Sequence, residues 1–396
     1  MKKIISLGGN FFQKTLVQAA KRMGVYVIDV DYLPDNPAHK YADEYYNIST
    51  LDREAVLKLA IEKGVDGIVS YASDISAPTA AYVSEKLNLP GNPLDTINIM
   101  TDKSLFHPFL KKHGFYVPDN EIVADYEQLV TFYEKSRDRI IVKPSHGSGS
   151  RGVSVVKDMD GLYDAWEEAL KYADKSVIVE EFIPRVGHQI AGDAFVRNGE
   201  IVFFGCANEH FDNDCNLLVP VGESFPAHIS NDCKETAKYV IGAALHSLGF
   251  VIGAVNLDFH FTSKGNVFLI ELGPRNGGNL ITDAIKISSG LDLAEYTVKA
   301  AIGEDISDLS DKTMERFIGT YIWHSAQEGI YQYIRYDRVL EEKLIRSDLF
   351  IQPGDKVWKY VNGKFGIGAA LIEFQSMDEM IYMMDHMTDY YEIVLA

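Results

Sequence analysis

The stretch IIVKPSHGSGSRGVSVV, residues 140–156, places a lysine and a glycine- and serine-rich loop between two segments rich in β-branched residues. A P-loop has its lysine after the glycines and a helix behind them, whereas here Lys143 precedes the loop and a strand-like pattern follows. We expect a strand–loop–strand lid whose backbone N–H groups fold over a polyphosphate, with Lys143 adding a positive charge. A glycine-rich hairpin without a ligand fits this stretch equally well.

Size and composition restrict the class of protein. The chain has 396 residues, a hydrophobic share of 46% and a formal net charge of −19. We therefore expect two or three domains in a cytoplasmic protein, with neither nucleic acid nor a membrane as partner. No segment approaches the length of an apolar membrane span, and the three cysteines have no metal-ligand spacing, so reduced thiols are expected.

The first hundred residues alternate strand-like and helix-like segments. Strands are expected over residues 2–8, 25–31 and 66–72, with helices between them that end at Gly24 and Gly64. This alternation predicts a Rossmann-like parallel sheet. Gly8 and Gly9 imitate a dinucleotide fingerprint, but the full G-x-G-x-x-G is absent. A nicotinamide oxidoreductase that uses these glycines and Asp31 remains an alternative.

Two acidic residues stand on neighbouring predicted strands. Asp258 lies in VNLDFHF and Glu271 in FLIELGPRNGG, and the linking TSKGN reads as a hairpin turn. Two carboxylates that converge on adjacent antiparallel strands suit Mg²⁺, and Arg275 follows close behind. Solvated carboxylates on a strand are the plainer alternative.

A third motif is VIVEEFI, residues 177–183, an apolar strand that ends in two glutamates. Burying the two glutamates at the end of this strand would cost free energy unless they faced a cleft. Backbone groups at Glu181 and Ile183 are placed to bind an adenine edge, with Glu180 accepting from the amino group.

Strand patterns dominate residues 190–272, and residues 311–396 look like a separate tail module. In the tail, Asn362-Gly363 suits a type I′ hairpin turn. The methionines of SMDEMIYMMDHM are expected to pack in a core.

In this order the motifs resemble the ATP-grasp superfamily, over about residues 1–305. The resemblance implies an α/β and α+β ATP-grasp fold with an N-terminal Rossmann-like domain (1–95), an ATP-grasp domain (96–310) whose lid covers about 116–185, and a C-terminal β-rich module (311–396). It assigns Lys103 and Lys143 to the ATP phosphates, Asp258 and Glu271 to Mg²⁺ or Mn²⁺, and Arg275 to the acceptor. The expected nucleotide-binding residues also include His146, Gly147, Ser148, Gly149, Ser150 and Gly152 in the lid, Glu180, Glu181, Phe182 and Ile183 at adenine, and His188 near the ribose.

Two departures from the family pattern bear on function. Asp258 stands where glutamate is commoner, and Gly273 and Pro274 replace the usual asparagine-x, which removes a third metal ligand. The E-x-small-P-R form resembles purine-pathway members, whereas PRNGG resembles the R-x-G-G of amino-acid ligases.

The resemblance implies an ATP-dependent, ADP-forming ligase that makes C–N bonds. It would phosphorylate a small-molecule carboxylate to an acyl phosphate and join it to an amine. A purine-biosynthesis enzyme of the glycinamide-ribonucleotide or phosphoribosylaminoimidazole type is the first alternative, and a non-catalytic ATP-binding regulator is the second. A homodimer is the default expectation for the assembly.

Overall fold

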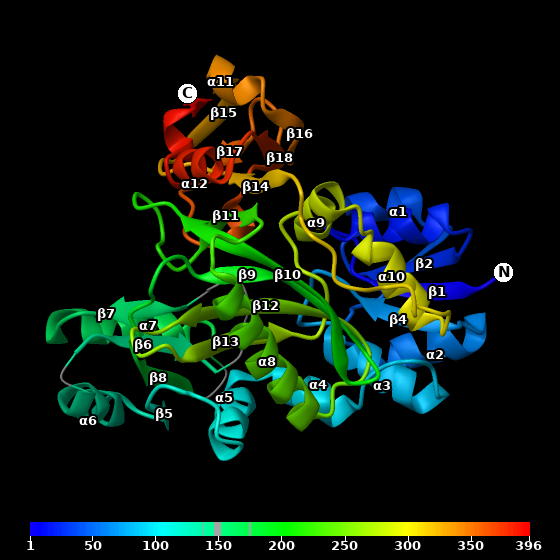
Figure 1. Cartoon of the computed structure of the whole chain (residues 1–396), viewed down its shortest axis with the longest axis horizontal. Helices are drawn as coiled ribbons and strands as arrows, with labels where there is room; N and C mark the ends of the chain where they lie inside the picture. Colours follow the sequence, from blue (N-terminus) through cyan, green and yellow to red (C-terminus); the bar gives the residue numbers. More distant parts are fainter. Residues whose placement is uncertain (137, 146–151, 174–175) are drawn as a thin grey trace.

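The computed structural model describes residues 1–136, 138–145, 152–173 and 176–396 (Figure 1). Figure 1 shows a parallel sheet near the N-terminus, a long central sheet and a small sheet on the other side of it, and the C-terminal segment adds a sheet of three strands. Within the described residues no helix is both long enough and apolar enough to cross a membrane.

The N-terminal sheet is parallel, with strand order β3-β2-β1-β4. The sequence predicted three of its strands and missed β3. Asp52 caps the helix that follows β3, and Gly64 ends that helix in the left-handed conformation. The elements are β1 (Lys3–Leu7), α1 (Lys14–Arg22), β2 (Tyr26–Asp31), β3 (Glu44–Asn47), α2 (Arg53–Lys63), β4 (Gly67–Ser70), α3 (Ala77–Leu87) and α4 (Leu94–Thr101).

The small sheet has strand order β5-β8-β6-β7. Strands β6 and β7 flank the glycine-rich loop and pair antiparallel, so the predicted strand–loop–strand arrangement is confirmed. Apolar residues of two helices pack against this sheet as its own core. The elements are α5 (Lys103–Lys112), β5 (Asn120–Val123), α6 (Tyr126–Ser136), β6 (Ile140–Pro144), β7 (Ser154–Val156), α7 (Leu162–Leu170) and β8 (Val177–Glu181).

The central sheet has eight strands in the order β13-β12-β9-β10-β11-β14-β18-β16. The long helix α8 packs beside it, capped by Ser230 and ended by Gly249. Its first elements are β9 (Ile190–Arg197), β10 (Glu200–Phe211), β11 (Pro220–Phe225), α8 (Asn231–Leu248), β12 (Gly253–Phe261), β13 (Val267–Gly273), α9 (Ile281–Ser289) and α10 (Leu293–Ala301).

The C-terminal segment both continues this sheet and forms a small antiparallel sheet of its own, with strand order β17-β15-β19. Strand β14 pairs with β11, and β18 and β16 extend the sheet beyond it. The predicted C-terminal module (311–396) and the predicted boundaries at 95 and 310 therefore stay predictions. The elements are β14 (Phe317–Trp323), β15 (Gly329–Tyr336), α11 (Arg338–Glu341), β16 (Leu344–Leu349), β17 (Lys356–Val357), β18 (Gly368–Phe374), α12 (Met377–Asp385) and β19 (Tyr391–Leu395).

Two local predictions in this segment had different outcomes. The methionines Met380, Met383 and Met384 of α12 are buried in the core, as expected. The predicted hairpin turn at Asn362-Gly363 is wrong, because the Asn362 side chain caps a short 3₁₀ helix instead. An asparagine side chain that accepts from a backbone N–H competes with the hairpin turn that the dipeptide otherwise favours.

Candidate active site

Two lysines from different elements meet carboxylates at the centre of the molecule. Lys143 on β6 donates from Nζ to Glu180 Oε1 at 2.7 Å, and both side chains are buried. Lys103, the first residue of α5, forms an ion pair with Glu271. His107 of α5 approaches Glu180 Oε2 at 3.4 Å. The structure therefore brings two predicted phosphate ligands together with two acidic residues.

The pKa of Glu180 shows which effect dominates among these groups. Burial alone would raise the pKa of this carboxyl, but the Lys143 ammonium and the His107 side chain hold it at about 2. Burial and the Lys103 charge lower the pKa of Lys143. Each buried charge is thus tolerated because an opposite charge lies beside it. The carboxylates therefore hold both lysines in position before a highly charged anion binds to them.

Asp258 and Glu271 lie directly opposite each other on β12 and β13. The turn between these strands is closed by Thr262 N–H, which donates to Asn266 O at 2.9 Å, so the predicted hairpin is confirmed. Burial and the Glu271 charge raise the pKa of Asp258 to about 7. Two half-buried carboxylates in register, one of them with a strongly raised pKa, match the hard oxygen ligands that Mg²⁺ takes.

These carboxylates belong to a longer row, which we call the acidic face. Residues that oppose each other, or stand two apart on one strand, share a face of a sheet. Register therefore puts five acidic residues on the same face of the central sheet across β13, β12, β9, β10 and β11. The acidic face consists of Glu271, Asp258, Asp193, Glu209 and Glu223. Sequence reasoning singled out the first two as metal ligands and did not predict that the other three share their face.

Glu209 is the most isolated member of the acidic face. Its Oε2 atom is buried and, among the described residues, has no hydrogen-bond partner. Burial raises the pKa of Glu209 well above its usual range, and the charges of Asp258 and Glu223 raise it further. The pKa of Glu223 is raised by burial to about 7. Its carboxylate accepts from Asn279 Nδ2 at 3.0 Å and from the Thr320 hydroxyl.

Asp193 fixes the loop that follows β13. Its carboxylate accepts from Gly277 N–H at 2.8 Å and from the amides of Asn256 at 3.2 Å and Asn276 at 3.3 Å. A Cβ at Gly277 would lie 3.1 Å from Asp193 Oδ1 and 2.8 Å from the Asn256 amide nitrogen. Glycine at this position therefore allows the backbone to reach Asp193.

Arg275 is held from the N-terminal sheet. Its Nε donates to Asp74 Oδ1 at 2.8 Å and its Nη2 to Asp74 Oδ2 at 2.6 Å. A Cβ at Gly273 would lie 2.8 Å from Asp74 Oδ1. The small residue in place of the family asparagine thus leaves room for this ion pair. Asp74 follows β4 and had no sequence signal, since only the fold brings it to Arg275.

The remaining predicted nucleotide-binding residues differ in whether the structure leaves them available for a nucleotide. Glu181 N–H donates to Asp119 O at 2.8 Å and Phe182 N–H to Arg139 O at 3.0 Å, so adenine binding there would rest on the Glu181 carbonyl and on Ile183. Gly152 is buried with a positive φ of 72°. His146, Gly147, Ser148, Gly149 and Ser150 lie outside the described residues. His188 contacts Asp385 of α12 at 3.2 Å rather than the two lysines.

The Gly8-Gly9 turn is occupied by the protein itself. A Cβ at Gly8 would lie 2.2 Å from the Gln13 side chain, and one at Gly9 would lie 2.2 Å from the His39 ring. Asp31 accepts from Gly9 N–H at 2.8 Å, so its carboxylate is engaged within the turn. These contacts fill the position that a dinucleotide phosphate would need.

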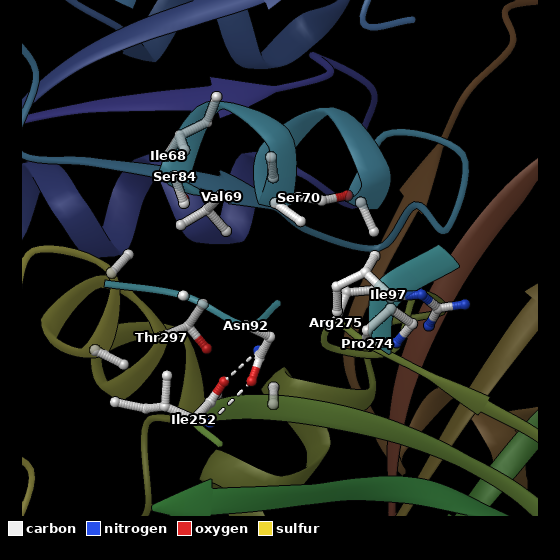
Figure 2. Close-up of a pocket in the computed structure, with 18 of the residues that line it drawn as sticks. Ile68, Val69, Ser70, Ser84, Asn92, Ile97, Ile252, Pro274, Arg275 and Thr297 are labelled. Carbon is white, nitrogen blue, oxygen red and sulfur yellow. Dashed lines mark hydrogen bonds between the residues drawn. The ribbon is translucent and has the colours of Figure 1, made fainter. Parts of the chain in front are cut away.

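A pocket of about 100 Å³ lies between the N-terminal sheet and the central sheet. Its lining is mostly apolar, and Asn92 binds the backbone of Ile252 across it at 2.7 Å. Figure 2 shows the Arg275 guanidinium at one edge of this pocket, pointing away from Asn92 and Thr297. The pocket is therefore distinct from the charged cluster of lysines and carboxylates.

Comparison with known proteins agrees with this geometry. The family model of the ATP-grasp domain matches residues 108–289. The uncharacterised protein y4rH of Sinorhizobium fredii is 27% identical over 74% of this chain and 61% of its own length. The formate-dependent phosphoribosylglycinamide formyltransferase of Prochlorococcus marinus is 25% identical over 78% of each chain.

Three solved structures share the fold. An L-amino acid ligase from Bacillus licheniformis has a TM-score of 0.82 at 20% identity, covering 100% of this chain and 99% of its own. A phosphoribosylglycinamide synthetase from Anaerococcus prevotii has a TM-score of 0.76 at 22% identity, with 100% of both chains covered. The biotin carboxylase domain of 2-oxoglutarate carboxylase from Hydrogenobacter thermophilus, solved with MgADP, has a TM-score of 0.77 at 18% identity, covering 100% and 91%. Residues 108–289 of this chain are an ATP-grasp domain, and the chain as a whole has the mixed α/β ATP-grasp fold that the sequence predicted.

Proposed function

We propose that this protein is an ATP-dependent ligase that phosphorylates a carboxylate and transfers the acyl group to an amine. One observation carries the proposal above all: Lys143, which is buried, and Lys103, which is half-buried and paired with Glu271, interact electrostatically with the Asp258–Glu271 pair in one cluster. Phosphoryl transfer depends mainly on positioning and on neutralising charge, which such a cluster provides.

The residues fit the two groups that the fold implies. Lys103 and Lys143 would bind ATP phosphates, and Asp258 and Glu271 would hold Mg²⁺ or Mn²⁺. The cation would neutralise the phosphate oxygens and make the terminal phosphorus easier to attack. On ATP binding, we expect the lysines to exchange their carboxylate partners for phosphate oxygens. Arg275, oriented by Asp74, would then bind the carboxylate substrate or the acyl phosphate through its remaining donors.

The acidic face supports an amine as the acceptor. Glu209 and Glu223 share a face of the central sheet with the metal-binding pair, and among the described residues neither forms an ion pair with a lysine or arginine. A positively charged ammonium group would supply such a partner. Because burial raises the pKa of Glu209, its carboxylate is suited to take a proton from the ammonium before the free amine attacks the acyl phosphate. A purine-pathway substrate is favoured by the similarity to the formyltransferase, and an amino acid by the similarity in fold to the L-amino acid ligase.

A substrate screen tests this function. The purified protein would be incubated with ATP, Mg²⁺ and pooled carboxylates and amines, including amino acids and purine-pathway ribonucleotides, and ADP release would be measured. The proposal expects one acid–amine pair to stimulate ADP release, and hydroxylamine to replace the amine with formation of a hydroxamate. ATP binding without turnover in any pool would instead support a non-catalytic ATP-binding regulator. Tight NADH binding without ATP binding would support the oxidoreductase alternative.

A further inference from the structure

A second cluster of chemically reactive side chains lies where β10 and β14 end. Both strands run antiparallel to β11 and flank it, so β10 and β14 are parallel to each other and their carboxyl ends lie at the same end of the central sheet. Asp212 and Cys215 follow β10, and His324 follows β14. One carboxylate oxygen, the thiol sulfur and one ring nitrogen of these residues all lie within 4.8 Å of one another.

The hydrogen bonds of His324 define what faces Asp212. Nδ1 lies 2.8 Å from the carbonyl oxygen of Ile322, which can only accept, so Nδ1 carries a hydrogen. In the neutral ring Nε2 then has a lone pair, and it lies 2.8 Å from Asp212 Oδ2. A lone pair and a carboxylate oxygen at this distance need a cation between them. That cation is either a proton, shared by Nε2 and Oδ2, or a metal ion.

A neighbouring histidine shows that this arrangement is not a general property of the sheet. His210 Nδ1 lies 2.6 Å from Asp385, and its Nε2 lies 2.8 Å from Ser224 Oγ. Asn208 donates to the same Ser224 oxygen at 3.0 Å, so the Ser224 hydroxyl hydrogen is available for His210 Nε2. The neutral His210 ring therefore donates from Nδ1 to Asp385, and hydrogen bonds alone satisfy this group.

We propose that Asp212, Cys215 and His324 form a site for a thiophilic divalent metal ion such as Zn²⁺. Carboxylate, thiolate and imidazole are the ligand types that zinc takes, with water completing a tetrahedral set. Two ligands come from one turn and the third from a distant strand. Within the turn, Asp214 N–H donates to Asp212 Oδ1 at 2.8 Å, and the other carboxylate oxygen, Oδ2, faces His324.

The surroundings of His324 match those of a metal-binding histidine. Such histidines usually donate their second ring N–H to a carbonyl or carboxylate, as His324 does to Ile322. The ring is 2% exposed and lies 4.8 Å from the ring of Tyr360, which restricts its orientation. Cys215 is half-buried, so the cluster is partly exposed to solvent. Tetrahedral ligand atoms lie roughly 3 to 4 Å apart, so the side chains need only small movements to bind an ion.

Metal binding would release two protons to solvent: the thiol hydrogen, which a metal–sulfur bond replaces, and the proton between His324 Nε2 and Asp212 Oδ2, whose place the ion takes. The ion would join the β10–β11 loop to the end of β14. Cobalt(II) provides a direct probe, since a thiolate ligand gives a near-ultraviolet charge-transfer band that the oxygen ligands of a magnesium site do not give. The full-length protein, stripped with chelator and titrated with CoCl₂ and then ZnCl₂, should show this band at one ion per chain and lose it to zinc.

Variants test whether cobalt binds at this cluster rather than elsewhere in the chain. Cys215→Ser should abolish the charge-transfer band, and His324→Gln should weaken cobalt binding by at least about tenfold. Cys233→Ser, at the other half-buried cysteine, should leave both unchanged. The inference is overturned if wild-type protein shows no thiolate band, or if the band survives Cys215→Ser. Should a variant fail to fold, the wild-type titration decides alone: zinc must raise the Tm of the stripped protein and be taken up with release of two protons.

Discussion

Asp74, which follows the last strand of the N-terminal sheet, holds the guanidinium of Arg275 through two parallel hydrogen bonds of 2.8 and 2.6 Å. The two residues are 201 positions apart and follow strands of different sheets, β4 and β13. Their side chains are only 13% and 11% exposed. A proposed substrate-binding arginine is thus oriented by a residue outside the matched ATP-grasp domain.

Replacing Asp74 by alanine should destabilise the protein by about 3 kcal/mol, because it leaves the Arg275 charge buried and unpaired. A matched control is the exposed two-bond pair of Arg316 and Glu373, with both bonds at 2.7 Å. Glu373→Ala should cost about 1 kcal/mol or less, since water screens that pair. Urea unfolding of both variants measures the difference. Equal losses in the two variants would show that the Asp74 pair has no special role.

Restoring the family asparagine at position 273 should harm this protein. A Cβ there would lie 2.8 Å from Asp74 Oδ1 and 3.3 Å from the guanidinium carbon of Arg275. Gly273→Asn should therefore displace Asp74, lower the Tm and reduce substrate-dependent turnover. Gly265→Asn in the β12–β13 turn is the control, because that position has open space and a positive φ that asparagine tolerates. A Gly273→Asn protein as stable and active as wild type would refute this explanation of the missing ligand.

The pKa of Asp258 predicts a specific pH dependence of stability. Its folded value of about 7 exceeds the ordinary value of 3.8, so the folded protein binds more protons between these two pH values. The contribution of Asp258 to the free energy of unfolding is fully present below about pH 4 and is lost as pH rises to about 7. Comparing wild type with Asp258→Asn isolates it, with a slope of at most about 1.4 kcal/mol per pH unit.

Without nucleotide, the stability difference between these two proteins should shift against wild type as pH rises through this window. A bound divalent cation should oppose the shift, because it stabilises the ionised carboxylate. The measurement is chemical unfolding at several pH values, with and without MgADP. If the difference in unfolding free energy between wild type and Asp258→Asn stayed constant from pH 4 to 7, the raised pKa of Asp258 beside Glu271 would be contradicted.

Much of this site could be predicted from local sequence, and the rest could not. The alternation around Asp258 and Glu271 and the turn TSKGN predicted their pairing, since both strands and the turn lie within one short segment. Asp193, Glu209 and Glu223 reach the same face only through the register of β9, β10 and β11 with their neighbours. Register between strands far apart in sequence depends on packing, which no local pattern reports. The same reason hid the pairing of β11 with β14 that joins the C-terminal segment to the central sheet.

Glu209→Gln should impair the step that consumes the amine while leaving nucleotide binding intact. The amide cannot take a proton, so we expect amine-dependent turnover to fall by about 100-fold or more. The affinity for MgATP should change little, and the ascending limb of the pH–rate profile should shift. Glu200→Gln, at an exposed position on the same strand, is the control. Turnover unchanged in Glu209→Gln would exclude a proton-accepting role for Glu209.

The transfer of oxygen from the acid substrate to phosphate tests the central claim most directly. Once the screen has identified that acid, its carboxylate is labelled with oxygen-18 and the released inorganic phosphate is analysed by mass spectrometry. Acyl phosphate formation predicts that the phosphate carries one label from the acid, and that Lys143→Ala and Glu271→Ala abolish the labelled product. Phosphate that contains oxygen only from ATP and water would contradict carboxylate activation in this site.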